Sequence, residues 1–208
     1  MYHIKPNLYI GFHGCDEMIR NRLIMNPNHV EKSNRPYDWL GNGFYVWENN
    51  FSRALQWAKD KASKNEITKA SVLGVVYTLS NCLDFTDSAF IDSISTYYYL
   101  MKNELEKVNI KLPKNRNHRK DKHNDKLIRE LDCAVIEYCH AKIDQEIKFQ
   151  MTSKGFSYLQ PYDSVRGLFT EGGEAFPGAA IQKKNHIQVC IRNVDMIKGF
   201  FIPKVQYS

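Results

Sequence analysis

The sequence has few cysteines and no long apolar run. Its five cysteines are irregularly spaced, which predicts reduced thiols and argues against a disulfide framework. The longest apolar stretch, V-L-G-V-V-Y-T-L at 72–79, is far shorter than the roughly 20 residues that a membrane helix needs. The first residues lack the order of charged, apolar and small residues that marks a secretory signal. These absences predict a cytoplasmic protein without a membrane segment.

Several familiar sites are also missing. The chain has no G-x-x-x-x-G-K-[ST], no G-x-G-x-x-G after a strand and no H-E-x-x-H. Cys133, Cys139 and His140 fall on one expected helix, but they lack the paired C-x-x-C spacing of a zinc site. Cys15 lies close to His13 in sequence, yet the alternation of strand positions gives its thiol no evident base. We therefore expect no metal.

Composition and charge fit a globular protein. With 208 residues, 43% of them hydrophobic and 12% aromatic, the chain is long enough for one domain (1–208) with an aromatic-rich core. The net charge of +6 is concentrated between Lys107 and Lys126, where eight Lys or Arg stand against two acids. This run is either a solvated loop or a contact for phosphates or an acidic partner.

The hydrophobic pattern predicts a mixed α+β order. Alternation in residues 43–47 puts Tyr45 and Trp47 on one strand face, and Asn50 offers a cap to the helix that follows. The helix at about 124–142 would bury Leu127, Leu131, Val135 and Tyr138. The expected strands are 8–13, 43–47, 72–79, 163–169 and 186–192. The expected helices are 15–25, 51–62, 86–108 and 124–142.

Three pieces of the sequence carry a resemblance. They are L-Y-I-G-F-H-G at 8–14, L-G-N-G-F-Y-V-W-E-N-N-F-S-R-A-L-Q-W-A at 40–58, and H-I-Q-V-C-I-R-N at 186–193. In kind and order they resemble the His, Tyr and Glu/Gln motifs of the ADP-ribosyltransferase superfamily, in its diphtheria-toxin and poly-ADP-ribose-polymerase branch. The closest similarity is to small bacterial toxin-like members. The resemblance frames nearly the whole chain and leaves residues 86–160 unexplained.

The resemblance implies roles for the first two pieces. His13 would hydrogen-bond the adenosine-side ribose of NAD, and the backbone of Gly14 would approach the carboxamide, which the missing side chain permits. Tyr45 would be the platform on which the nicotinamide ring stacks. Ser52 would touch the carboxamide, and Trp57 would cover the other face of the ring.

The third position departs from the polymerase pattern. His186, Gln188 and Cys190 share one strand face, and Gln188 fits the toxin-like pattern best, with His186 as the alternative. A neutral amide stabilises a developing positive charge less than a carboxylate does, which favours single transfer over chain building. The carboxylate could instead be supplied by Glu171 or Glu174. Both lie in the Gly-rich loop with which members of the family contact the acceptor.

The expected fold is the ADP-ribosyltransferase fold, two packed and mainly antiparallel sheets (a split β-sandwich) with surrounding helices and a helical and basic insertion at about 86–145. The resemblance implies a mono-ADP-ribosyltransferase that uses NAD as co-substrate and releases nicotinamide. It further implies a bacterial or phage toxin or effector of the kind that acts in toxin–antitoxin or phage-defence systems. Two other readings are a non-enzymatic RNA-binding module and an NAD-dependent RNA phosphotransferase on the same fold.

The expected partners are a macromolecular acceptor, either nucleic acid or protein, and an antitoxin or inhibitor protein. Phosphates of a nucleic acid would contact the basic run, with these residues as substrate-binding candidates: Lys114, Arg116, Arg119 and Lys120.

Overall fold

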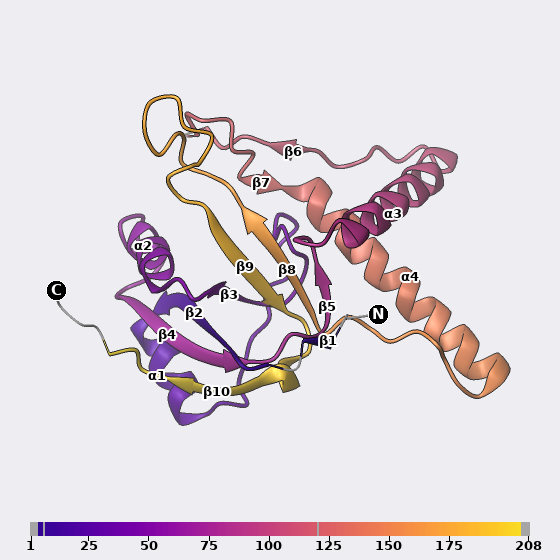
Figure 1. Cartoon of the computed structure of the whole chain (residues 1–208), viewed down its shortest axis with the longest axis horizontal. Coiled ribbons are helices and arrows are strands. Elements are labelled where there is room, and N and C mark those ends of the chain that lie inside the picture. Colours follow the sequence, from indigo (N-terminus) through magenta and orange to yellow (C-terminus); the bar gives the residue numbers. More distant parts are fainter. Residues whose placement is uncertain (1–3, 6, 120, 205–208) are drawn as a thin grey trace.

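The computed structural model describes residues 4–5, 7–119 and 121–204, and it combines a large sheet, a two-stranded sheet and helices (Figure 1). The strands are β1 (Ile4–Lys5), β2 (Tyr9–Asp16), β3 (Phe44–Glu48), β4 (Ala70–Tyr77), β5 (Ser80–Asp84), β6 (Asn115–Arg116), β7 (Ile128–Arg129), β8 (Ser164–Phe169), β9 (His186–Ile191) and β10 (Ile197–Phe201). The helices are α1 (Glu17–Met25), α2 (Phe51–Ala62), α3 (Ser88–Lys107), α4 (Glu130–Lys154) and a short 3-10 turn at Val194–Met196. The mixed α and β order is confirmed.

The main sheet has the strand order β1-β5-β8-β9-β3-β2-β4-β10. Its neighbouring strands are antiparallel except for β5 and β8, so the mainly antiparallel character is confirmed. The strands do not form the two separate packed sheets expected from the sequence. The reason is that β2 bonds to β4 along one edge and, at Gly11–Glu48 and Phe12–Trp47, to β3 along the other.

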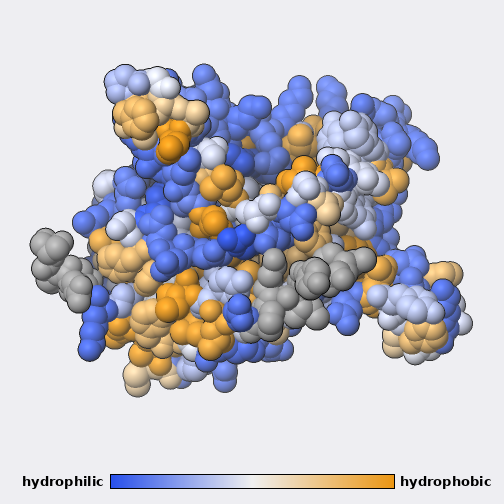
Figure 2. All heavy atoms as spheres, in the orientation of Figure 1, coloured by the Kyte–Doolittle hydropathy of each residue, from blue (hydrophilic) through white to orange (hydrophobic). Residues whose placement is uncertain are grey.

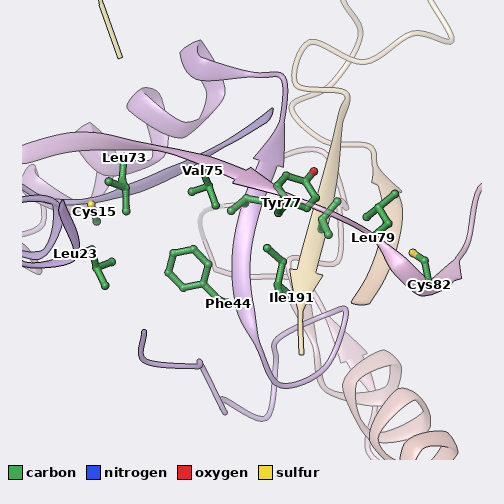
Figure 3. Packing of buried hydrophobic residues seen from close by; sticks show 11 residues of the cluster. Cys15, Leu23, Phe44, Leu73, Val75, Tyr77, Leu79, Cys82 and Ile191 are labelled. Atoms are coloured by element: carbon green, nitrogen blue, oxygen red, sulfur yellow. The ribbon is translucent and has the colours of Figure 1, made fainter. Parts of the chain in front are cut away.

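Apolar side chains cover both faces of this sheet. On one face, Leu73, Val75 and Tyr77 of β4 meet Phe44 of β3 and Leu23 of α1 in a fully buried cluster (Figure 3). On the other face, a second cluster joins β5, β8 and β9 to α3 and α4, and a third lies beneath α2. Burial of this apolar area is the main favourable term in folding, and it leaves β3 and β9 enclosed on both sides.

Local capping explains where two helices begin. Asp16 ends β2 and accepts a hydrogen bond from Met18 N at 2.9 Å, which starts α1. Asn50 accepts from Arg53 N at 3.0 Å and starts α2, as the sequence predicts. These caps direct α1 and α2 across the ends of β2 and β3.

The fourth helix differs from its expected range. It runs over Glu130–Lys154, not 124–142, because its first turn is capped by Asn115, whose Oδ1 accepts from Leu131 N at 3.0 Å and Asp132 N at 3.3 Å. It ends at Gly155, which adopts φ 77°. Leu127 therefore precedes the helix and is 37% exposed, so its expected inward position is wrong.

In the described part of the chain, no helix is both long enough and apolar enough to cross a bilayer. All five cysteines are free and buried. Within the same residues no group of three or more His, Cys, Asp or Glu side chains is arranged to hold a metal ion.

Candidate active site

A cleft of about 480 Å³ lies where β2, β3, β9 and α2 meet. It brings together residues that are far apart in the sequence and that the resemblance singles out. These residues are His13, Gly14, Tyr45, Trp57, Glu171, His186 and Gln188. The volume falls within the range of about 300–1,000 Å³ that is usual for small-molecule sites.

His13 lies where β2 and β3 separate. Their paired register ends at Phe12 and Trp47, and the next contact is made by the His13 ring, whose Nδ1 lies 2.7 Å from the carbonyl oxygen of Tyr45. A carbonyl only accepts, so Nδ1 carries the proton. Burial lowers the pKa of His13, which keeps the ring neutral and leaves Nε2 as an acceptor.

Gly14 has a structural reason to be glycine. A Cβ built on it would lie 2.3 Å from the backbone oxygen of Ala54 in α2 and 3.3 Å from the ring of Trp57. Such contacts are too short for real atoms, so the missing side chain allows α2 to pack directly on β2. Gly14 also lines the cleft, where its backbone faces the same space as Trp57.

Tyr45 offers only its ring to a ligand. Its hydroxyl donates to Gly41 O at 2.8 Å and accepts from Leu40 N at 2.9 Å, and burial raises its pKa well above the usual value. The phenol is thus neutral, and both its polar functions are used. Tyr45 and Trp47 pack on one side of β3 while Phe44 packs on the other, which confirms the shared face expected from the sequence.

Gln188 and His186 point to the same side of β9 but make different contacts. Gln188 Oε1 accepts from Trp39 Nε1 at 2.6 Å, so the NH₂ group of the amide remains to donate into the cleft. His186 is buried, lies 2.6 Å through Nδ1 from Lys184 O, and stacks on Phe169 with ring centroids 5.5 Å apart. Burial lowers its pKa. His186 is therefore part of the aromatic wall.

Glu171 forms an ion pair with Arg53 inside the cleft, and their side chains are 9% and 11% exposed. Arg53 Nε and Nη1 are buried without a hydrogen-bond partner among the described residues, and so is Trp47 Nε1. The Arg53 guanidinium lies 5.8 Å from the centre of the Trp47 ring. Buried donors without acceptors cost free energy, and a ligand with acceptor oxygens would satisfy them.

Ser52 does not line the cleft. It is exposed on α2, whereas the next residue, Arg53, points into the site. Successive helical side chains are separated by about 100° around the axis, so the choice of Ser52 was off by one position. Sequence reasoning missed Arg53, although its four-residue spacing from Trp57 places both on one helix face.

Four other expected contact residues lie outside the cleft. Glu174 Oε2 accepts from Gly178 N at 2.9 Å in a separate hollow. Lys114 and Arg119 are exposed, and Arg116 pairs with Glu130 at 2.5 Å. Lys120 falls outside the described residues. Glu174, Lys114, Arg116 and Arg119 do not line the cleft that His13 and Gln188 share.

Trp39 is a second residue that the sequence did not identify. Its indole lies over β8, where a Cβ on Gly167 would approach it to 2.8 Å, and Arg129 stacks on it at 5.3 Å from the ring centre. From this position beside the paired residues Gly167 and Gln188, Trp39 Nε1 sets the orientation of the Gln188 amide. No local pattern around residue 39 predicts this contact.

No family model, curated protein or solved structure matches the chain.

Proposed function

We propose that the protein is an NAD-dependent mono-ADP-ribosyltransferase that moves one ADP-ribose group to a macromolecule and releases nicotinamide. The observation that carries this proposal is the cleft itself. It joins buried, unpartnered donors of Arg53 and Trp47, the buried carboxylate of Glu171 and the ring of Tyr45. A dinucleotide offers phosphate and hydroxyl oxygens for the donors and flat rings for the aromatic walls.

The neutral cleft residues orient the co-substrate. His13 Nε2 accepts a hydrogen bond from a ribose hydroxyl, and the Gln188 amide donates one to a ribose oxygen, while Trp39 keeps that amide in place. The nicotinamide ring stacks on Tyr45, whose hydroxyl is already bonded to the backbone. Such positioning lowers the barrier because the reacting atoms are held close before reaction.

The carboxylate of Glu171 supplies the charge that Gln188 lacks. In the proposed step the bond between ribose C1′ and the nicotinamide nitrogen breaks, and its electron pair leaves with nicotinamide. An acceptor atom forms the new bond to C1′ and loses its proton to water. Positive charge develops on the ribose as the first bond breaks, and a buried carboxylate stabilises it. Glu171 fits this role because it lines the cleft and Glu174 does not.

The test is the rate of nicotinamide release from NAD. We expect release by the wild-type protein and a fall on the order of 100-fold or more in Glu171→Gln, which keeps the shape and removes the charge. Glu174→Gln is the matched control and should behave as wild type. Absence of nicotinamide release from the folded wild-type protein, or equal rates in both variants, contradicts the proposal.

A further inference from the structure

We propose that the acceptor is a nucleic acid, whose phosphates lie along the basic segment, defined as residues 107–126, at the rim of the cleft. The transfer to that acceptor rests on the proposed function, whereas the binding does not. The segment links α3 to α4 through β6, beside the loop that follows β8 (Figure 1). In Figure 2 the upper border between the tip of that loop and α3 shows predominantly hydrophilic side chains, whereas the tip itself is partly hydrophobic.

The two acids of the basic segment accept hydrogen bonds from backbone N–H groups. Asp121 accepts from His123 N at 2.9 Å and from Asp125 N at 2.8 Å. Asp125 in turn accepts from Gly172 N at 2.9 Å. Both carboxylates thus help to shape the loop, and among the described residues neither forms an ion pair with a Lys or Arg of the segment.

Basic side chains of the segment, by contrast, face solvent. Lys114, Arg119 and Lys122 are exposed, and no carboxylate of the described residues pairs with them. Arg116 is exposed as well but pairs with Glu130. Basic side chains without a carboxylate partner attract the closely spaced charges of a phosphate backbone.

The basic segment is joined to the loop that carries Glu171. The Asp125 bond to Gly172 N fixes one point, and the His123 ring lies so close to Gly173 that a Cβ there would approach it to 2.6 Å. Leu127, immediately after the segment, lines the cleft. A nucleic-acid strand bound along these basic side chains therefore passes close to the loop that holds the carboxylate of Glu171.

A polar hollow of about 230 Å³ beside the segment favours a nucleic acid over an acidic protein. It is lined by Asn115, Lys126 and Gln182 among others, and Gln182 Oε1 is buried there without a partner among the described residues. The two acids at its wall, Asp125 and Asp132, already accept from Gly172 N and Asn115 Nδ2. Base edges carry N–H donors that this amide oxygen can accept, together with phosphates for the lysines. The side-chain carboxylates with which an acidic protein would contact these lysines carry no such donor themselves.

The test is fluorescence anisotropy of the whole protein with labelled single strands of DNA and RNA, from about 50 to about 200 mM salt. We expect wild-type binding that weakens with salt. In the triple variant Lys114→Gln, Arg119→Gln, Lys122→Gln, affinity should fall at least about tenfold and the slope of log K against log salt should decrease by about 2 units, at about 0.7 per phosphate contact. Nicotinamide release without acceptor should be unchanged.

The control variant is Lys59→Gln, Lys148→Gln, Lys154→Gln, which removes three exposed bases elsewhere. Binding of neither strand, equal losses in both variants, or displacement of the strands by polyglutamate at equal charge overturns the proposal. The comparison of DNA with RNA identifies the source of the phosphates. A wild-type protein that binds a strand but never releases nicotinamide contradicts the proposed function and leaves nucleic-acid binding intact.

Discussion

Individual protonation and hydrogen-bond states decide what the cleft can do. His13 is neutral because burial lowers its pKa, and the carbonyl of Tyr45 sets which nitrogen carries the proton. The indole of Trp39 sets which end of the Gln188 amide is free. The site thus presents a defined acceptor at His13 and a defined donor at Gln188.

At this scale the first prediction concerns Gln188→Ala. Removal of one polar contact in a closed site costs about 2–4 kcal/mol in the barrier, or on the order of 30- to 1000-fold in the rate of nicotinamide release. NAD affinity should fall less, because the ring contacts of Tyr45 survive. Steady-state kinetics of nicotinamide release test this prediction, and we expect the change mainly in kcat.

His186→Ala is the comparison for that variant. His186 is packed between Phe169 and Trp47, so its loss should lower the melting temperature, which Gln188→Ala should leave near the wild-type value. An active Gln188→Ala protein combined with a folded but inactive His186→Ala protein would show that the third motif position is His186.

Some contacts that position the helices involve neighbouring residues and can be predicted from the sequence, whereas others join distant residues and cannot. Asn50 and Asp16 cap helices from adjacent positions; the sequence predicts the cap at Asn50, whereas Asp16 falls inside the expected helix 15–25. The start of α4 depends on Asn115, which is far from it along the chain, so periodicity alone extended the helix wrongly. The end of α4 was likewise not predicted: the expected helix stops at 142, whereas α4 continues to the C-cap at Gly155, which takes the left-handed conformation typical of a helix end.

The packing of α2 on β2 gives the second prediction. Gly14→Ala places a methyl group against the backbone of Ala54, which cannot withdraw without moving α2, so the free energy of unfolding should fall by about 1–3 kcal/mol. Gly199→Ala is the control, because a Cβ there meets nothing within 4 Å. Denaturant unfolding should show a clear loss for the first variant and at most a small change for the second.

The third prediction follows from His140 on α4. Burial lowers its pKa to about 3, and Nε2 has no hydrogen-bond partner among the described residues. Between pH 6.5 and about 3 the unfolded chain binds a proton that the folded protein does not, so the unfolding free energy should decrease as the pH falls through this window.

Denaturant unfolding at several pH values checks this effect. The slope due to His140 is at most about 1.4 kcal/mol per pH unit, and His140→Gln should remove it. His29→Gln, at an exposed histidine, should leave the slope unchanged. An unaltered slope in His140→Gln would show that the imidazole is protonated in the folded protein.

At the scale of the whole molecule, the resemblance supplied the three segments that meet in the cleft. From hydrophobic alternation, which is a local pattern, the sequence predicted five of the ten described strands: β2, β3, β4, β8 and β9. It did not predict Arg53 or Trp39, whose roles arise from the ion pair with Glu171 and the bond to Gln188 across the fold. Joining β2 to β3 in one continuous sheet is likewise a long-range outcome.

The central claim is that this cleft binds NAD, and titration calorimetry tests it most directly. We expect one NAD per chain for the wild-type protein and for Ser52→Ala, whose changed residue is exposed and outside the cleft. Arg53→Lys keeps the charge but removes the planar fork and its buried donors, and its affinity should fall about tenfold or more. No NAD binding by the folded wild-type protein, or equal affinity in Arg53→Lys and Ser52→Ala, would contradict the account.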